Sequence, residues 1–233
     1  IAFNGGYDEA VKAFLADVDF SKVKLCLPSM PDDTVTLNGA VALMANVKEK
    51  GVDVQAAADA FEEFVQAYST RDGYMYDAHN RLGDARYTLR EFAKARKAYN
   101  VVLSSTSSGR DYARYQLAMV DGIERKTKSK IERLKSIVED GKGDYVDDAW
   151  YELGRTYMAE ERYKEGAQAL RDFTNTDTGS PYYISALSDL GLAYYNINQR
   201  SEALKCYEEV VAYDPQSSAA LEAMRGIREI YVG

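Results

Sequence analysis

Residues 150–157 read WYELGRTY, and residues 187–194 read LSDLGLAY. In both stretches a large apolar residue, a leucine, a glycine and a tyrosine follow one another at spacings of three, one and three. This spacing places the four side chains on one face of an α-helix. The two glycines, Gly154 and Gly191, are 37 residues apart, so the sequence repeats with a period that is long enough for two helices.

The repeat extends in both directions, with a marker pair at the same place in each period. The steps between the second members of these pairs are 34 to 38 residues. The marker pairs are Met44-Ala45, Leu82-Gly83, Leu117-Ala118, Leu153-Gly154, Leu190-Gly191 and Met224-Arg225. Alanines 12 residues after three of the markers are each followed, four residues later, by an aromatic residue: Ala57 by Phe61, Ala95 by Tyr99 and Ala203 by Tyr207. Each repeat is therefore predicted to be two amphipathic helices whose small residues allow close approach of the backbones.

These motifs resemble the tetratricopeptide repeat. The first helix of that family carries a Trp, Leu, Gly, Tyr pattern, which the stretch from Trp150 to Tyr157 matches, and its second helix carries Ala, an aromatic residue and a closing Pro, as at Ala203, Tyr207 and Pro215. The resemblance implies an all-α, right-handed superhelical solenoid of antiparallel helix pairs. The departures are Lys48, Arg86 and Asp121 at the tyrosine position, and Lys130 and Gly166 at the alanine position.

The period is slightly longer than the 34 residues usual in the family. In this respect the chain is similar to bacterial envelope tetratricopeptide proteins, such as the TolA-binding cell-division coordinators and the outer-membrane assembly lipoproteins. That similarity favours a periplasmic or outer-membrane-associated location over a cytoplasmic one.

The periodicity predicts that residues 1–233 form a single array and are a fragment of a longer protein. The predicted parts are a half-repeat at 1–18, a long connection at 19–35, helix pairs at 36–68, 75–104, 110–140, 145–175 and 181–212, and a half-repeat at 217–231. The half-repeats are expected to leave Phe14 and Ile230 without neighbouring helices, and so to favour self-association. The connection at 19–35 is either a plain surface loop or a functional one.

Composition narrows the function further. Of the 233 residues 46% are hydrophobic, which is enough for a core, and no apolar run has the length of about 20 residues that spans a membrane. The net charge of −8 argues against nucleic acid as a partner. Between Arg86 and Lys135, however, 13 Lys or Arg residues accompany 5 Asp or Glu residues. This basic band is either a solvated helix face or a surface for an acidic partner.

Residues for catalysis are scarce. His79 is the single histidine and falls on the predicted packing face, which favours a core role. Asp144, Asp147 and Asp148 are interpreted as caps of the helix that follows rather than as a metal cluster. No known phosphate-loop, metalloprotease or nucleophile motif occurs. We therefore expect no enzyme activity, no metal and no cofactor.

Counted from the second residue of each marker pair, the positions three before, one after and four after are expected to face the concave groove of the solenoid. Tyr112, one helical turn before Tyr115, is expected to face it as well. The candidate binding residues are Asn80, Asp84, Tyr87, Tyr112, Tyr115, Met119, Tyr151, Arg155, Met158, Ser188 and Tyr195. Tyrosines suit a binding groove, although several of them could simply pack between repeats. The sequence thus predicts a non-catalytic scaffold for a protein or peptide. The alternative is a carbohydrate- or peptidoglycan-binding helical module.

Overall fold

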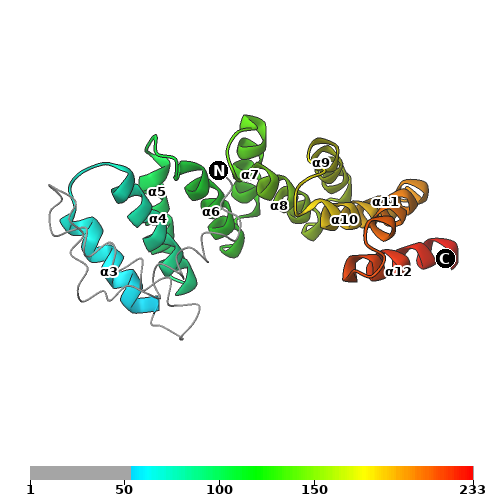
Figure 1. The fold of residues 1–233 in the computed structure, drawn as a ribbon, viewed down its shortest axis with the longest axis horizontal. Helices are drawn as coiled ribbons and strands as arrows, with labels where there is room; N and C mark the ends of the chain where they lie inside the picture. Colours follow the sequence, from blue (N-terminus) through cyan, green and yellow to red (C-terminus); the bar gives the residue numbers. More distant parts are fainter. Residues whose placement is uncertain (1–53, 233) are drawn as a thin grey trace, which may run out of the picture. The chain divides into compact units, whose positions relative to one another are not determined.

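The computed structural model describes residues 54–232, and this part of the chain is built from ten α-helices without a β-strand (Figure 1). The helices are α3 (Val54–Ala67), α4 (Gly73–Thr88), α5 (Phe92–Leu103), α6 (Arg110–Ile123), α7 (Thr127–Asp140), α8 (Val146–Ala159), α9 (Tyr163–Thr176), α10 (Tyr183–Asn196), α11 (Arg200–Tyr213) and α12 (Ser218–Val232). The all-α, tetratricopeptide-like fold that the sequence predicts is confirmed. The predicted half-repeat at 1–18, the connection at 19–35 and the start of the pair at 36–68 lie outside the described residues.

The chain divides into two compact units, one ending at Glu124 and the other beginning at Arg125. In the first unit α4 packs against α3 and α5, and α6 packs against α5. In the second unit α8 packs against α7 and α9, α10 against α9 and α11, and α12 against both α10 and α11. Because α6 and α7 belong to different units, their pairing as one repeat over 110–140 stays a prediction, as does the single array.

The turns between the two helices of a repeat share one conformation. Arg90, Arg125, Glu161 and Asn198 have positive φ angles between 56° and 62°, at steps of 35 to 37 residues. In the turn after α8, the amide of Arg162 donates to the carbonyl of Tyr157 at 2.9 Å. The turn after α10 repeats this bond between Gln199 and Tyr194 at 2.8 Å. A left-handed residue therefore closes each of these turns with a side chain other than glycine.

The marker glycines allow a large side chain of the second helix to approach the first. A Cβ atom added at Gly154 would lie 2.5 Å from Leu170, and one added at Gly191 would lie 2.6 Å from the ring of Tyr207. The side chain that needs this space lies four residues after the alanine position of the second helix. It is Tyr207 in one repeat and Leu170 in the other. Leu170 and Tyr207 belong to the buried core of the second unit.

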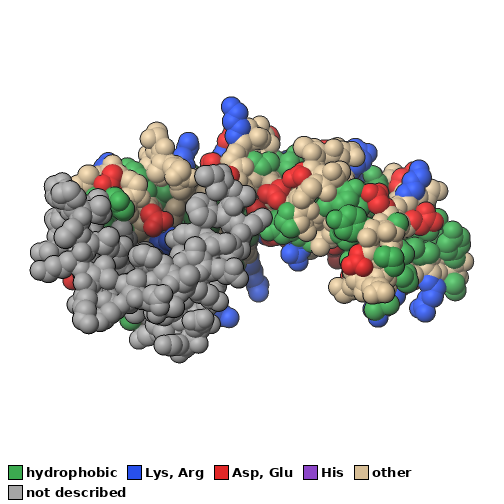
Figure 2. Space-filling model, in the orientation of Figure 1, with side chains coloured by type: hydrophobic (Ala, Val, Ile, Leu, Met, Phe, Trp, Pro, Cys, Tyr) green, Lys and Arg blue, Asp and Glu red, His purple; other side chains and the backbone are tan. Residues whose placement is uncertain are grey.

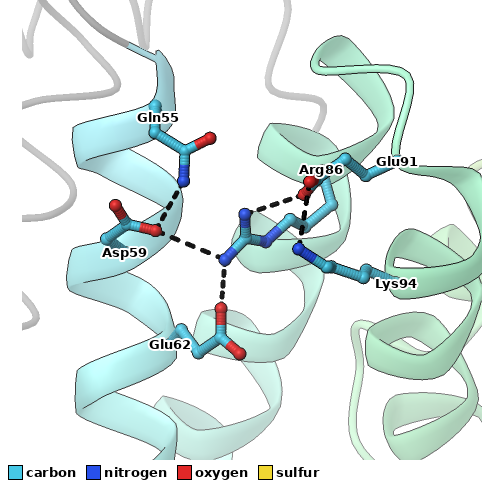
Figure 3. Close-up of polar contacts among 6 residues, drawn as sticks. All are labelled: Gln55, Asp59, Glu62, Arg86, Glu91 and Lys94. Atoms are coloured by element: carbon cyan, nitrogen blue, oxygen red, sulfur yellow. Dashed lines mark hydrogen bonds and ion pairs between the residues drawn. The ribbon is translucent and has the colours of Figure 1, made fainter.

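Two departures at the tyrosine position, Arg86 and Asp121, are buried charges. Arg86 is only 3% exposed, and its guanidinium contacts Glu62 and Asp59 on α3 and lies 2.8 Å from Glu91 (Figure 3). Lys94 in turn lies 3.0 Å from the other carboxylate oxygen of Glu91. An ion-pair cluster at this position therefore joins α3, α4 and the start of α5.

The next repeat has the opposite charge at the same place. Asp121 is 1% exposed and accepts a hydrogen bond from the Arg96 guanidinium at 2.7 Å. Arg96 also contacts Glu124 at 2.5 Å. In the second unit, Lys130 at an alanine position pairs with Glu152 at 2.5 Å. Each of these departures is thus compensated by a charge on another element.

The last marker pair, Met224-Arg225, lies on an open face of α12. Met224 is 42% exposed and Arg225 is also exposed, whereas Ala220 and Ala223 are fully buried. Ala220 lies five residues before Arg225, as the fully buried Ala186 lies five residues before Gly191. In α10 the marker residue Leu190 is buried in the core that α10 forms with α11, whereas within the described residues no second helix follows α12. The expectation for the C-terminal half-repeat also changes, because Ile230 is half-buried against the core of the second unit.

Candidate functional site

The predicted binding residues lie on the first helices of the repeats. Within each helix they are three, four or seven residues apart, so they share one helix face. The first unit contributes Asn80, Asp84 and Tyr87 from α4 and Tyr112, Tyr115 and Met119 from α6. The second unit contributes Tyr151, Arg155 and Met158 from α8 and Ser188 and Tyr195 from α10.

In the first unit Asp84 is the centre of a hydrogen-bonded cluster. Its Oδ1 atom accepts from the hydroxyl of Tyr99 at 2.7 Å and from that of Tyr112 at 2.6 Å. The two rings meet edge to face, with centroids 6.4 Å apart. Burial raises the pKa of Asp84, although both phenols oppose this shift by stabilising the carboxylate. Asp84 therefore holds α4, α5 and α6 together, and sequence reasoning missed Tyr99 as its partner.

Asn80 also makes a contact between helices. It is 6% exposed, and its side-chain amide donates to the carbonyl of Gly109 at 3.0 Å, just before α6 begins. Tyr87 is half-buried, with its ring edge-on to Phe92 at 5.7 Å. Tyr115 and Met119 are half-buried as well. The part of this face that is open to solvent is thus formed by Tyr87, Tyr115 and Met119 rather than by the polar residues.

In the second unit the site is built around Tyr151. Its ring stacks on that of Tyr182, with centroids 5.1 Å apart and an interplanar angle of 18°. The exposed guanidinium of Arg155 lies 5.7 Å from the centre of the Tyr151 ring. Burial raises the pKa of Tyr151, and the negative charge of Asp189 adds to this shift. Burial also raises the pKa of Asp189, against the attraction of Arg155.

The other candidates on α8 and α10 are less open. Met158 and Tyr195 are partly buried against the core of the second unit, and Ser188 is half-buried. Between them, Leu192 is 46% exposed, at the position directly after the Gly191 marker. Because Leu192 is apolar and exposed on a well-formed helix, it indicates an interaction surface more strongly than these partly buried candidates do.

Helix α12 also has exposed side chains along one of its faces. Leu221 is 54% exposed, and Arg225 and Arg228, four and seven residues further on, are exposed as well. Sequence reasoning did not single out these three residues. We call the set Tyr151, Arg155, Leu192, Leu221, Arg225 and Arg228 the α8–α10–α12 face.

The residues considered for catalysis take structural places. Asp147 and Asp148 lie in the first turn of α8, at the positive end of its dipole as the sequence predicts, although the residue at the N-cap position is Tyr145 and makes no side-chain capping bond. Asp147 accepts from the Ser180 hydroxyl at 2.9 Å and Asp148 from the Tyr182 hydroxyl at 2.7 Å, because both point toward the next repeat. Burial raises the pKa of Cys206 to about 11, which leaves it a protonated thiol.

Between residues 54 and 232, no group of three or more His, Cys, Asp or Glu side chains is placed to hold a metal ion. Over the same range, no helix has the length and apolar character needed to cross a membrane.

Comparison with known proteins agrees with this architecture. Family models described as tetratricopeptide repeat match residues 43–110, 147–177 and 184–217. Together the matches span more than half of the sequence, and the chain belongs to the tetratricopeptide repeat family. No curated protein matches it.

Similar folds occur among solved structures. The MamA protein of Desulfovibrio magneticus RS-1, from residue 41 to its end, has a TM-score of 0.63 at 18% identity, with 82% of this chain and 99% of that chain covered. YrrB, described as a tetratricopeptide protein with an unusual peptide-binding site, has a TM-score of 0.59 at 17% identity, with coverages of 83% and 92%. A tetratricopeptide repeat protein from Parabacteroides merdae has a TM-score of 0.61 at 12% identity, with coverages of 84% and 79%. At these identities the likeness concerns the fold alone.

Proposed function

We propose that the protein is a non-catalytic scaffold that binds extended segments of a protein partner, mainly through the α8–α10–α12 face. The observation that carries this proposal is the presence of Leu192 and Leu221 on that face, 46% and 54% exposed on well-formed helices. Exposed apolar side chains that are grouped on one face are typical of interaction sites. The peptide-binding site named for YrrB supports the same type of function.

The charges on the face favour a particular kind of peptide. Arg155, Arg225 and Arg228 are exposed there, and an arginine guanidinium binds a carboxylate through paired hydrogen bonds. Burial raises the pKa of Asp189, near Arg155, because it disfavours the charged form of that carboxylate. The favoured ligand is a peptide that alternates apolar and acidic residues.

The test uses a random peptide library displayed on phage, followed by affinity measurements on the enriched peptides. Leu192→Asp and Arg155→Ala are each expected to weaken binding at least tenfold, since anchors at interfaces are worth about 2 kcal/mol or more. Lys205→Ala, an exposed change on α11, serves as the control and should leave affinity unchanged. Equal affinities in all variants would contradict the assignment of the face. Binding of glycan fragments in the absence of any peptide would favour the carbohydrate-binding alternative.

Self-association through the C-terminal helix is a separate part of the proposal. Tyr231 and Val232 are 71% and 83% exposed, and Figure 2 shows hydrophobic surface at the C-terminal end of α12. Met224, at the position where other repeats have a buried leucine, is 42% exposed. We expect dimers at high protein concentration that Met224→Glu dissociates, measured by sedimentation equilibrium. The other predicted end, at Phe14, lies outside the described residues.

The bacterial envelope assignment rests on the length of the repeat alone. We propose it as the location of the protein, and fractionation of cells that express the complete gene product is the direct test. Recovery in the periplasmic or membrane fraction would support the assignment, and recovery in the cytosol would contradict it.

A further inference from the structure

A cavity in the first unit lies apart from the predicted binding face. Its volume is about 370 Å³, within the range of about 300–1,000 Å³ that is usual for small-molecule sites. The α3–α4 loop contributes Ser69 and Arg71 to its wall. Helix α4 contributes Met75, Tyr76 and His79, and the C-terminal end of α5 contributes Val101 and Ser104. Three consecutive elements of the first unit thus form the cavity.

His79 lies in the wall of this cavity, but its Nδ1 atom is closed off from it. That atom is buried and has no hydrogen-bond partner among the residues described, so a ligand in the cavity does not reach it. Burial lowers the pKa of His79, which keeps the ring neutral near pH 7. His79 therefore adds an uncharged ring surface to the wall.

Arg71 gives the cavity a positive charge. Within residues 54–232, the structure places no carboxylate within ion-pair distance of Arg71. The adjacent carboxylate of Asp72 is already engaged, because it accepts from the Tyr68 hydroxyl at 2.5 Å and from the amides of Tyr74 and Met75. The guanidinium of Arg71 is therefore available for an anionic group on a ligand.

The rest of the wall is largely apolar. Met75 is 8% exposed, Tyr76 is half-buried, and Val101 is 38% exposed on α5. Such a surface would cover an apolar group of moderate size. The Ser104 hydroxyl donates to the carbonyl of Asn100 at 2.9 Å, so toward a ligand it can only accept.

We propose that this cavity binds a ligand with an apolar body and one carboxylate, with the carboxylate on Arg71 and the apolar body against Met75, Tyr76 and Val101. A free small acid and the C-terminal residue of a peptide share this chemistry. The cavity is separate from the α8–α10–α12 face, so this inference can fail or succeed independently of the proposed scaffold function.

Two probes distinguish a free small acid from the C-terminal residue of a peptide as the ligand. The first is N-acetylphenylalanine, and the second is an acetylated tripeptide that ends in Phe with a free carboxylate. Each is compared with its C-terminal amide by isothermal titration. We expect saturable binding of the acids and at least tenfold weaker binding of the amides. Equal affinity of the two acids identifies a free small acid, and a tripeptide preference of tenfold or more identifies a chain end.

Variants connect binding to the cavity. Arg71→Gln should abolish the preference for acid over amide, and Val101→Phe should weaken binding of both by filling the space. Lys97→Gln removes the same charge from an exposed site on α5 outside the cavity and should change nothing. Circular dichroism melts establish that each variant is folded. The absence of saturable binding to the folded wild-type protein would overturn the proposal, as would an affinity that neither Arg71→Gln nor Val101→Phe alters.

Discussion

The ring of Tyr207 on α11 lies against the backbone of Gly191 on α10, so closely that a Cβ atom at Gly191 would be 2.6 Å from Tyr207 Cε1. The opposite edge of the same ring meets Gly226 on α12, where an added Cβ atom would be 2.5 Å from Cε2. One aromatic side chain thus fills the space between three helices of the second unit. It can do so because two of the three helices have a glycine at the contact.

Gly191→Ala is therefore expected to destabilise the second unit. Overpacking a core costs about 1–3 kcal/mol, which outweighs the gain of about 1 kcal/mol that alanine brings to a helix interior. Gly73→Ala at the start of α4 is the matched control, because an added Cβ atom there has no atom within 4 Å. The control should be neutral or stabilising. Urea unfolding measures both, and equal stability of the two variants would show that the Tyr207 ring moves without cost.

The helix pairs could be predicted because their markers are large and regularly spaced. Leu153 and Leu190 are buried at 3% exposure, as their spacing predicts. At α12 the marker residue Met224 is exposed, because within the described residues no second helix follows to cover it. The residues that α12 buries are Ala220 and Ala223, whose small side chains give a weak hydrophobic signal in the sequence.

The binding residues were harder to predict because tyrosine and aspartate suit both a groove and an interhelical contact. Asp84 was placed correctly on the face of α4, but its hydrogen bonds depend on Tyr99 and Tyr112, 15 and 28 residues away in sequence. Arg86 likewise finds Glu62 across 24 residues. Such partners become visible only when the helices are placed in space.

The second prediction concerns Arg86, and Arg86→Met should destabilise the first unit by about 1–3 kcal/mol through loss of charge-assisted hydrogen bonds. The loss stays below the 3–5 kcal/mol typical of a fully buried pair. The reason is that the carboxylates of Asp59, Glu62 and Glu91 are 60%, 42% and 32% exposed and can be rehydrated. Arg81→Met is the control, since the Arg81–Asp77 pair is more open at 34% and 49% exposure, and should cost under about 0.5 kcal/mol. Urea unfolding compares them, and similar losses would argue against a stabilising role of the cluster in Figure 3.

The third prediction is a pH dependence at Asp84. Burial raises its pKa in the folded state, so between the ordinary value of 3.8 and the raised value the folded protein binds more protons than the unfolded chain. Stability from this group therefore falls as the pH rises through that window. Asp84→Asn retains an oxygen that can accept from Tyr99 and Tyr112 but carries no charge.

We expect Asp84→Asn to be more stable than the wild type at pH 7, with the advantage shrinking as the pH is lowered toward 4. Urea unfolding at a series of pH values follows the difference. Glu208→Gln, an exposed change on α11, should show no such trend. If the wild type instead became more stable relative to Asp84→Asn as the pH rises, the hydrogen bonds from Tyr99 and Tyr112 would outweigh the cost of burying the charge of Asp84.

The last prediction concerns the turn between α8 and α9. Glu161 has a φ angle of 56°, a conformation that costs a residue other than glycine about 1–2 kcal/mol. Glu161→Gly removes this cost but adds about 0.5–1 kcal/mol of backbone entropy, so we expect a net gain of up to about 1 kcal/mol. Glu161→Val should be destabilising, because a β-branched side chain tolerates positive φ least. Lys164→Gly, in the first turn of α9, is the control for the entropic term and should lose up to about 1 kcal/mol. Thermal unfolding ranks the variants, and a loss in Glu161→Gly as large as in Lys164→Gly would mean that the turn holds no strain for glycine to relieve.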